Sequence, residues 1–324
     1  MPTRPLTRAQ RRLRELRWFR ALPNTWREHA QAYCDLASAL EHPASARPGP
    51  PLTVVLPVFT RPENLALSVS LALRTPGVTE VRVCLNDPAM RAEDLLDEND
   101  QRIVVDLARV RRGPVERYRA AARGTGSHFV SPDDDLFLHP RQLRGLADRA
   151  LGEPRCAHGI YGQLFDTGAQ RYTQNLCRRD GTVHVLNRAY AFSRDHLVRY
   201  LALLDSLDVP TDAARIAIDD DIVLSFAAEG LPQVHDLGPW IDCPSETDPR
   251  VSRFGRRDAA RRRCALFNDL ARRAGLPDAL GPFAEQPRWS WAPRTAAGAS
   301  LFYASGLPLA RALWRTLPFH SSHA

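Results

Sequence analysis

The sequence predicts an α/β fold in which helices flank a mostly parallel central sheet. Short runs rich in β-branched residues have the composition of buried parallel strands. These runs are LTVVLPVF at 52–59, EVRVCL at 80–85, RIVVDL at 102–107 and SHFV at 127–130. Helical segments separate them, since RPENLALSVSLALRT opens with a Pro–Glu pair and VERYRAAARGTG stops at glycine. Alternation of strands with helices is typical of α/β domains.

The first 50 residues are predicted to form a helical extension. Apolar residues recur there at near-helical spacing, in two stripes. The stripes are Leu13, Leu16, Phe19 and Leu22, and then Trp26, Ala30, Tyr33, Ala37 and Leu40. We expect two helices packed on the main domain, with docking of the first, basic helix on a membrane surface as the alternative. The segment HPASARPGPP then has the composition of a linker.

We therefore predict an extension at 1–50, a principal domain at 51–275 and a tail at 276–324 that packs on the domain or on a membrane surface. The 324 residues are 44% hydrophobic and 25% charged, which is ordinary globular composition. No apolar run is long enough to cross a bilayer, and the basic N-terminus lacks the apolar core of a secretory signal.

The cysteine pattern argues against a zinc cage or a disulfide framework, because the six cysteines are scattered and form no CxxC pair. Reduced thiols and a cytoplasmic location are expected. The net charge is +7, and all 44 basic residues are arginine. Such a charge suits an anionic partner: nucleic acid, a diphosphate or an acidic membrane surface.

A triplet of aspartates follows the strand predicted at 127–130. Alternate side chains of an extended segment point the same way, so Asp133 and Asp135 should face one pocket and Asp134 should face elsewhere. Two carboxylates suit Mg²⁺ or Mn²⁺, and a metal there would neutralise charge on a diphosphate. The alternative is a turn rich in aspartate, since SPDD is good turn chemistry.

A second acidic run, Asp219–Asp221, opens a predicted helix that ends at Gly230. Acids in a first helical turn stabilise free N–H groups, and capping alone explains one or two of the three. Alternatively, one carboxylate points into the cleft, where it could deprotonate a hydroxyl or stabilise positive charge. His235, which follows this run, is a candidate further metal ligand or an ordinary loop histidine.

Arginine is dense in the stretch at 250–273. Most of these side chains should lie on solvated helix faces, and one or two could bind a diphosphate through paired hydrogen bonds. Binding of a nucleic-acid backbone is the alternative, weakened by the lack of a recognisable module and of interleaved aromatic residues. The sequence has no GxxxxGK[ST] loop and no GxSxG motif.

Five segments together resemble nucleotide-sugar glycosyltransferases with the GT-A, Rossmann-like fold, over roughly residues 52–275. They are LTVVLPVFTRPENLALSVSLAL, VRVCLNDP, ERYRAA, SHFVSPDDDLFL and IDDDIVLSFAAEG. The chain looks most similar to the exostosin-like transferase domain, with the family 2 glycosyltransferases as broader relatives. The Asn86–Asp87 strand end, the Arg117–Tyr118 pair and a late Arg–Cys–Phe pattern favour the exostosin-like side.

The resemblance implies roles for the residues that match the family's motifs. Asp133 and Asp135 match the ends of the DxD motif, one near the ribose and one on Mn²⁺ or Mg²⁺. The positions that hold the nucleotide sugar are matched by Arg61, Asn86, Arg117, Asp133, Asp134 and Arg261. Asp220 and Asp221 match a Glu–Asp pair near the acceptor, with Asp221 at the catalytic position. Asp in place of Glu, and ERY in place of NRF, depart from the family's pattern.

The implied activity is metal-dependent transfer of a hexose or N-acetylhexosamine from a nucleoside diphosphate sugar, with UDP favoured, to a glycan or lipid-linked hydroxyl. A nucleotidyltransferase or sugar-nucleotide pyrophosphorylase is the alternative enzyme, although its usual Gly-rich loop is absent near residue 57. A basic nucleic-acid-binding protein without catalysis is the alternative outside the enzymes. We expect no nucleic-acid partner and a cytoplasmic protein, with peripheral contact at the inner face of the membrane left open.

Overall fold

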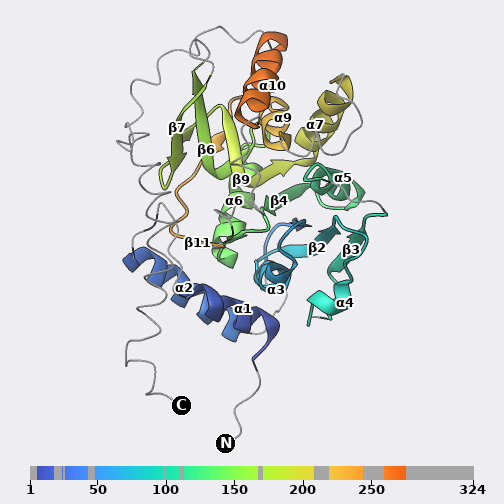
Figure 1. The fold of residues 1–324 in the computed structure, drawn as a ribbon, viewed down its shortest axis with the longest axis vertical. Coiled ribbons are helices and arrows are strands. Elements are labelled where there is room, and N and C mark those ends of the chain that lie inside the picture. Colours follow the sequence, from blue (N-terminus) through green and yellow to red (C-terminus); the bar gives the residue numbers. More distant parts are fainter. Residues whose placement is uncertain are drawn as a thin grey trace, which may run out of the picture. The chain divides into compact units, whose positions relative to one another are not determined.

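The computed structural model has the predicted α/β architecture, with a nine-stranded sheet between layers of helices (Figure 1). It describes residues 6–17, 24, 26–42, 48–97, 99–109, 113–166, 171–207, 219–243, 245 and 259–274. The predicted tail at 276–324 lies outside the described residues. Among the described helices, none is both long and apolar enough to cross a membrane.

The N-terminal half of the sheet is parallel, in the order β3-β2-β1-β4. Its strands are β1 (Leu52–Val58), β2 (Val78–Leu85), β3 (Ile103–Leu107) and β4 (His128–Pro132). The connecting elements are η1 (Pro62–Asn64), α3 (Leu65–Leu73), α4 (Ala92–Leu95) and α5 (Glu116–Arg123). These elements confirm the predicted alternation, and they bring the carboxyl ends of the strands to one edge, where ligands bind in such sheets.

The C-terminal half of the sheet is mixed, because β9 runs antiparallel to β4 and to β6. Its strands are β6 (His158–Asp166), β7 (Arg171–Cys177), β8 (Gly181–Thr182), β9 (Val185–Ser193) and β10 (Gln233–Val234). A separate small sheet pairs β5 (Leu136–Phe137) with β11 (Ile241–Asp242). The remaining helices are α6 (Pro140–Gly152), α7 (Arg194–Ser206), α9 (Asp220–Phe226) and α10 (Ala259–Arg273).

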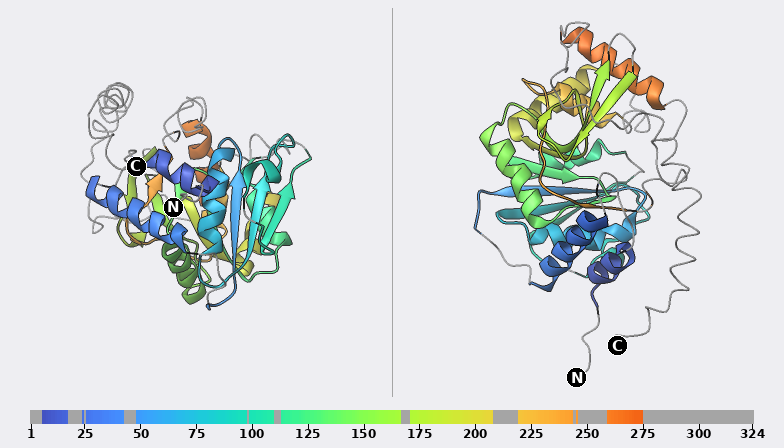
Figure 2. Two further views of the ribbon diagram at one scale, coloured as in Figure 1. Left: turned by 90° about the horizontal axis from the view of Figure 1, so that it is seen from below. Right: turned by 90° about the vertical axis from the view of Figure 1, so that its left-hand side faces the viewer.

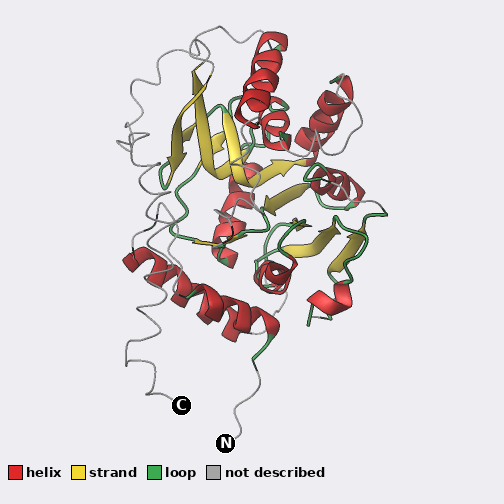
Figure 3. Ribbon diagram, in the orientation of Figure 1, coloured by secondary structure: helices red, strands yellow, loops and turns green. Residues whose placement is uncertain are grey.

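Each face of the large sheet carries its own apolar core (Figure 3). One core joins the strands to α5, α7, α9 and α10 and includes Tyr118, Tyr200 and Phe267, all buried. The other joins the strands to α3 and α6 and includes Val69 and Leu146. Because both faces are covered, β1 is buried along its whole length, as the sequence indicated, whereas the edge strand β3 is largely exposed.

The N-terminal helices α1 (Arg8–Leu16) and α2 (Trp26–Glu41) pack on α3, as Figure 2 shows. Leu13 of α1 and Leu36 of α2 are buried in a third apolar core, which includes Leu71 of α3. Of the stripe predicted for the second helix, Leu40 is buried in this core and Tyr33 and Ala37 pack against it, whereas Ala30 is exposed. The apolar face of α1 is therefore covered by protein.

Candidate functional site

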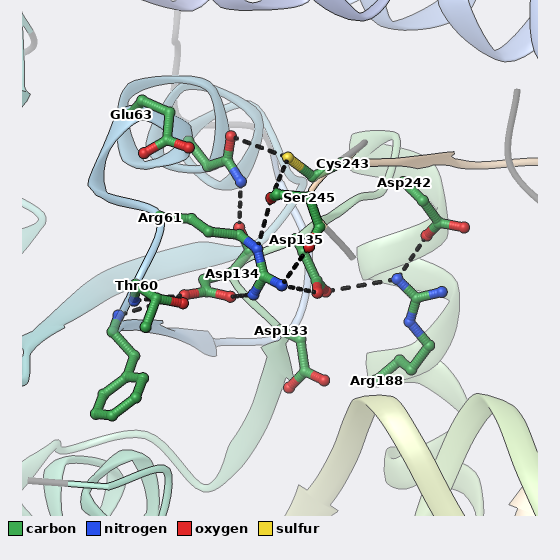
Figure 4. A network of polar contacts seen from close by, with 12 residues as sticks. Thr60, Arg61, Glu63, Asp133, Asp134, Asp135, Arg188, Asp242, Cys243 and Ser245 are labelled. Carbon is green, nitrogen blue, oxygen red and sulfur yellow. Dashed lines mark hydrogen bonds and ion pairs between the residues drawn. The ribbon is translucent and has the colours of Figure 1, made fainter. Parts of the chain in front are cut away.

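The first acidic run lies in a turn directly beyond β4 (Figure 4). The N–H of Leu136 donates to the carbonyl of Asp133 at 3.3 Å, and the N–H of Asp133 donates to the carbonyl of Arg188 at 2.6 Å. The predicted extended geometry, with Asp133 and Asp135 on one side, was wrong because the strand ends before the acids. In the turn, Asp134 and Asp135 contact Arg61, whereas Asp133 contacts Arg117.

Arg61, at the start of η1, holds two of these acids. Its Nη1 lies 2.8 Å from Oδ1 of Asp134, and its Nη2 lies 3.2 Å from Oδ2 of Asp135. Its Nε donates to the hydroxyl of Ser245 at 2.8 Å. Arg61 is 7% exposed, so these charges meet largely away from bulk water. Asp134 also accepts from the N–H of Thr60 at 3.4 Å, which fixes the turn against the end of β1.

Arg188 of β9 is a second cation beside the turn. Its Nη2 lies 3.4 Å from Oδ1 of Asp135 and 2.7 Å from Oδ1 of the fully buried Asp242. Its backbone has a φ of 73°, which is a left-handed conformation that a non-glycine residue rarely adopts. The register between β6 and β9 shifts between Gly159 and Tyr161, beside Asn187. Arg188 therefore lies next to an irregular part of the strand pairing and contacts the acidic turn. Residues with strained backbone conformations are common at functional sites.

Asn86 follows β2 at the same edge of the sheet. The residue is fully buried, and its backbone N–H donates to the carbonyl of Val58 at 3.1 Å. Both polar atoms of its side chain are buried without a hydrogen-bond partner in the described part of the chain. An unpaired buried amide is costly, so this side chain is suited to bind a polar group of a ligand.

Arg117 of α5 joins the two acidic runs. Its Nη1 lies 2.8 Å from Oδ1 of Asp133, and its Nε lies 3.6 Å from Oδ2 of Asp220. The pair with Asp133 is close but not aligned as a hydrogen bond, so both atoms keep hydrogen-bonding capacity. The guanidinium also lies 5.3 Å from the centre of the Tyr190 ring, a cation–π distance. Aspartates far apart in the sequence thus belong to one site.

The second acidic run begins α9 and is buried. Asp221 receives Nη1 and Nη2 of Arg263, from α10, at 2.8 and 2.6 Å. It also accepts from the side-chain amide of Asn187 at 2.6 Å. Oδ2 of Asp220, in contrast, has no hydrogen bond within the described residues. Burial raises the pKa of Asp220 to about 7, although Arg117 opposes the shift.

Two predicted site residues lie elsewhere. Arg261 is exposed on α10, and Arg263 is the arginine that reaches the second acidic run. His235 pairs with His158, with Nε2 and Nδ1 of the two rings 3.0 Å apart, where β10 meets β6. Burial lowers the pKa of His235 to about 4, which keeps this ring neutral near pH 7.

The residues that suit a metal are carboxylates. Among the described residues, no group of three or more histidine, cysteine or acidic side chains is placed to hold a metal ion. Asp133 is partly exposed, and the contacts of Asp135 with its arginines, 3.2 and 3.4 Å, are longer than tight charge-assisted hydrogen bonds. Two carboxylates fit Mg²⁺ or Mn²⁺, which proteins commonly bind through one or two acids together with substrate phosphates.

Sequence reasoning missed Arg188, Asn187 and Arg263. Arg263 had a usable signal, because it stands four and seven residues before Phe267 and Leu270, the buried residues of α10. That spacing places all three on one helix face. For Arg188 and Asn187 no local pattern was available, because their positions depend on the register of antiparallel strands.

Comparisons with known proteins give weak structural likenesses. No protein-family model matches the chain, and no curated protein matches it. Among solved structures, a CMP:2-keto-3-deoxy-manno-octonic acid synthetase complexed with CTP matches at 14% identity and a TM-score of 0.40, over 61% of this chain and 95% of that one. GalNAc-T7 with UDP, GalNAc and Mn²⁺ matches at 8% identity and a TM-score of 0.42, over 60% of this chain and 43% of that one.

Proposed function

We propose that the chain is a glycosyltransferase that moves a hexosyl or N-acetylhexosaminyl group from a nucleoside diphosphate sugar to a hydroxyl. The acceptor is a glycan or a lipid-linked sugar, and UDP is the favoured base. The carrying observation is the bridge that Arg117 makes between Asp133 and Asp220. It supports one cleft with a donor side and a reacting side, at the edge of the sheet where ligands bind.

The donor side consists of the first acidic turn and its arginines. The buried amide of Asn86 is suited to hydrogen-bond the base, and Asp133 is suited to accept from a ribose hydroxyl. Arg61 and Arg117 provide positive charge for a diphosphate, which guanidinium groups bind well. Asp134 contributes by fixing Arg61. Arg261, exposed on α10, is the weakest member of the proposed donor site.

Asp133 and Asp135 are the residues that would hold Mn²⁺ or Mg²⁺. A bound cation would neutralise charge on the diphosphate leaving group. For Asp135, binding would require its carboxylate to turn from Arg61 and Arg188, which then become available to the phosphates. In this proposal, Arg61 and Arg188 exchange their contacts with Asp135 for contacts with the phosphates when the cation binds.

The reacting side consists of Asp220 and Asp221, and the two have different surroundings. Asp221 is neutralised by Arg263 and oriented by Asn187, so its suited role is to position the helix and stabilise nearby positive charge. Asp220 has an oxygen without a hydrogen bond among the described residues, and its pKa is raised by burial to about 7. A base with that pKa is well matched to removing a proton from an acceptor hydroxyl near neutral pH.

The test is a panel of nucleotide sugars incubated with the protein and Mn²⁺, followed for release of nucleoside diphosphate. Release with one donor, stimulated by an acceptor glycan, supports the proposal. Formation of pyrophosphate from a sugar phosphate and a nucleoside triphosphate would instead identify a nucleotidyltransferase. Absence of binding to UDP or GDP in calorimetry, together with binding to nucleic acid, would favour the binding protein.

Location at the inner face of the membrane is part of the same proposal. Arg11 and Arg14 on the outward face of α1 are exposed, so contact with anionic lipid would use charge and not the buried apolar face. Sedimentation with vesicles containing phosphatidylglycerol, compared with neutral vesicles, tests this contact.

A further inference from the structure

Arg12 of α1 contacts two residues that hydrogen-bond to the acidic turn. Its Nε donates to Oδ1 of Asn64 at 2.7 Å, and its Nη2 lies 3.2 Å from Sγ of Cys243. The Arg12 side chain is 16% exposed, while Asn64 and Cys243 are each 1% exposed. One arginine from the N-terminal extension therefore contacts two buried residues from distant parts of the chain.

Each of those residues holds the acidic turn by its backbone. The side-chain nitrogen of Asn64 donates to the carbonyl of Asp134 at 2.6 Å. The backbone N–H of Cys243 donates to the carbonyl of Asp135 at 2.7 Å. The contacts of Arg12 thus lead to two consecutive peptide groups of the turn.

The same region also fixes Arg61. Sγ of Cys243 lies 3.1 Å from the hydroxyl of Ser245, which accepts from Nε of Arg61 at 2.8 Å (Figure 4). A change at Arg12 therefore affects both the carboxylates and the cation of the proposed donor site. No side-chain contact of Arg12 in the described residues is with an acid of the turn itself, so Arg12 acts through other groups.

We infer that Arg12 is a positioning residue of the donor site, and that the N-terminal helix is consequently part of the nucleotide-binding apparatus. This inference rests on the proposed function. Without Arg12, Oδ1 of Asn64 loses its charged donor and keeps only a 3.9 Å contact with Sγ of Cys243, so the amide is less firmly oriented toward Asp134. The turn then samples orientations in which its carboxylates and Arg61 no longer converge. Residues that orient ligand-binding groups from behind typically change affinity by about 10–100-fold.

The experiment compares Arg12→Ala with Arg14→Ala in the full-length protein. Arg14 is on the same helix but exposed, so its replacement controls for lost charge and altered helix propensity. Calorimetry measures UDP and GDP affinity with Mn²⁺, and the donor panel gives KM and kcat. We expect Arg12→Ala to bind the nucleotide about tenfold more weakly and to raise KM more than it lowers kcat. In the absence of lipid, Arg14→Ala should bind both nucleotides with the affinity of the wild type.

A purely structural role predicts another pattern. In that case Arg12→Ala would lower the melting temperature but bind the nucleotide normally well below it, and that result would overturn the inference. If Arg12→Ala does not fold, Arg12→Lys provides the measurement, because an ammonium group lacks the fork that spans Asn64 and Cys243. Wild-type affinity in Arg12→Lys would then reject the inference. Failure of the wild type to bind either nucleotide would reject the proposed function itself.

Discussion

The two acidic runs have the same composition and opposite surroundings. In the first, Arg61, Arg117 and Arg188 each meet a carboxylate, and the turn is held both through its peptide groups and through the carboxylate of Asp134. In the second, Arg263 neutralises Asp221, while Asp220 keeps an oxygen without a hydrogen bond among the described residues. The difference shows that a run of three aspartates does not by itself define a role. The role depends on which arginines the fold places beside each carboxylate.

Asp221→Asn should have the largest effect. Removing the charge of Asp221 breaks a buried, hydrogen-bonded pair and leaves Arg263 with the longer contact to Asp219, at 3.9 Å; breaking a buried pair costs about 3–5 kcal/mol. We expect the free energy of unfolding to fall by about 3 kcal/mol, and turnover to fall because the helix that carries Asp220 is held less firmly. Urea denaturation measures the first and the donor assay the second.

A double variant, Asp221→Asn with Arg263→Met, is the control for this pair. It removes both charges and should recover most of the lost stability, because a buried ion pair can often be replaced by apolar groups of similar volume. If the single variant unfolds at the same urea concentration as the wild type, the Asp221–Arg263 pair contributes little to stability. The proposed difference between the two acidic runs would then be wrong.

Asp220→Asn should reduce turnover by about 10²-fold, the usual scale for a positioned acid–base group, with unchanged nucleotide affinity. Burial raises the pKa of Asp220 to about 7, so the wild-type rate should increase with pH up to that value and then level off. The variant should lack this increase. A wild-type rate that is independent of pH between 5 and 8 would exclude Asp220 as the base.

The same raised pKa has a consequence for stability. A carboxyl with a higher pKa in the folded state contributes stability at a pH below its unfolded value, and this contribution is lost as the pH rises through the folded value. Relative to Asp220→Asn, the wild type should therefore lose stability between about pH 4 and pH 7. Urea titrations of both proteins across this range make the comparison.

Asp135→Asn should weaken nucleotide binding in the presence of Mn²⁺ by about tenfold or more, and leave the fold intact. The substitution keeps the shape of the side chain but removes the charge that a cation requires. Calorimetry with and without EDTA measures the difference. An affinity that EDTA and the substitution both leave unchanged would remove the metal from the proposal and leave the arginines as the diphosphate ligands.

Arg261→Ala should have the smallest effect. The side chain is exposed, and exposed ion pairs usually contribute about 1 kcal/mol or less. We expect at most a fivefold loss of nucleotide affinity, corresponding to about that energy. A loss above tenfold would place Arg261 on the diphosphate after all.

The parallel half of the fold was predictable because local composition specifies it. LTVVLPVF and EVRVCL correspond to β1 and to most of β2, because runs rich in β-branched residues suit strands that are covered on both faces. The antiparallel strand β9 was not predicted. Its residues include Asn187 and Arg188, and its partners β4 and β6 are set by tertiary register.

The candidate site divides in the same way. Arg61, Asn86 and Arg117 were predicted from motifs; Arg61 and Asn86 lie just beyond the ends of β1 and β2, and Arg117 lies on α5. Arg261 was chosen from a motif, whereas the phase of α10, with Phe267 facing the core, selects Arg263. Motif spacing indicates which helices and strands border the site. Which side chain of a helix faces the site depends on how that helix packs against the core.

The left-handed backbone conformation of Arg188 lowers the stability of the folded state. A non-glycine residue in that region costs about 1–3 kcal/mol, and glycine would avoid the cost. Glycine would also remove the guanidinium that lies between Asp135 and Asp242. Losing one partner of a buried ion pair costs about 3–5 kcal/mol, which exceeds the strain. Glycine at this position should therefore lower the stability of the fold as well as the positive charge beside the acidic turn.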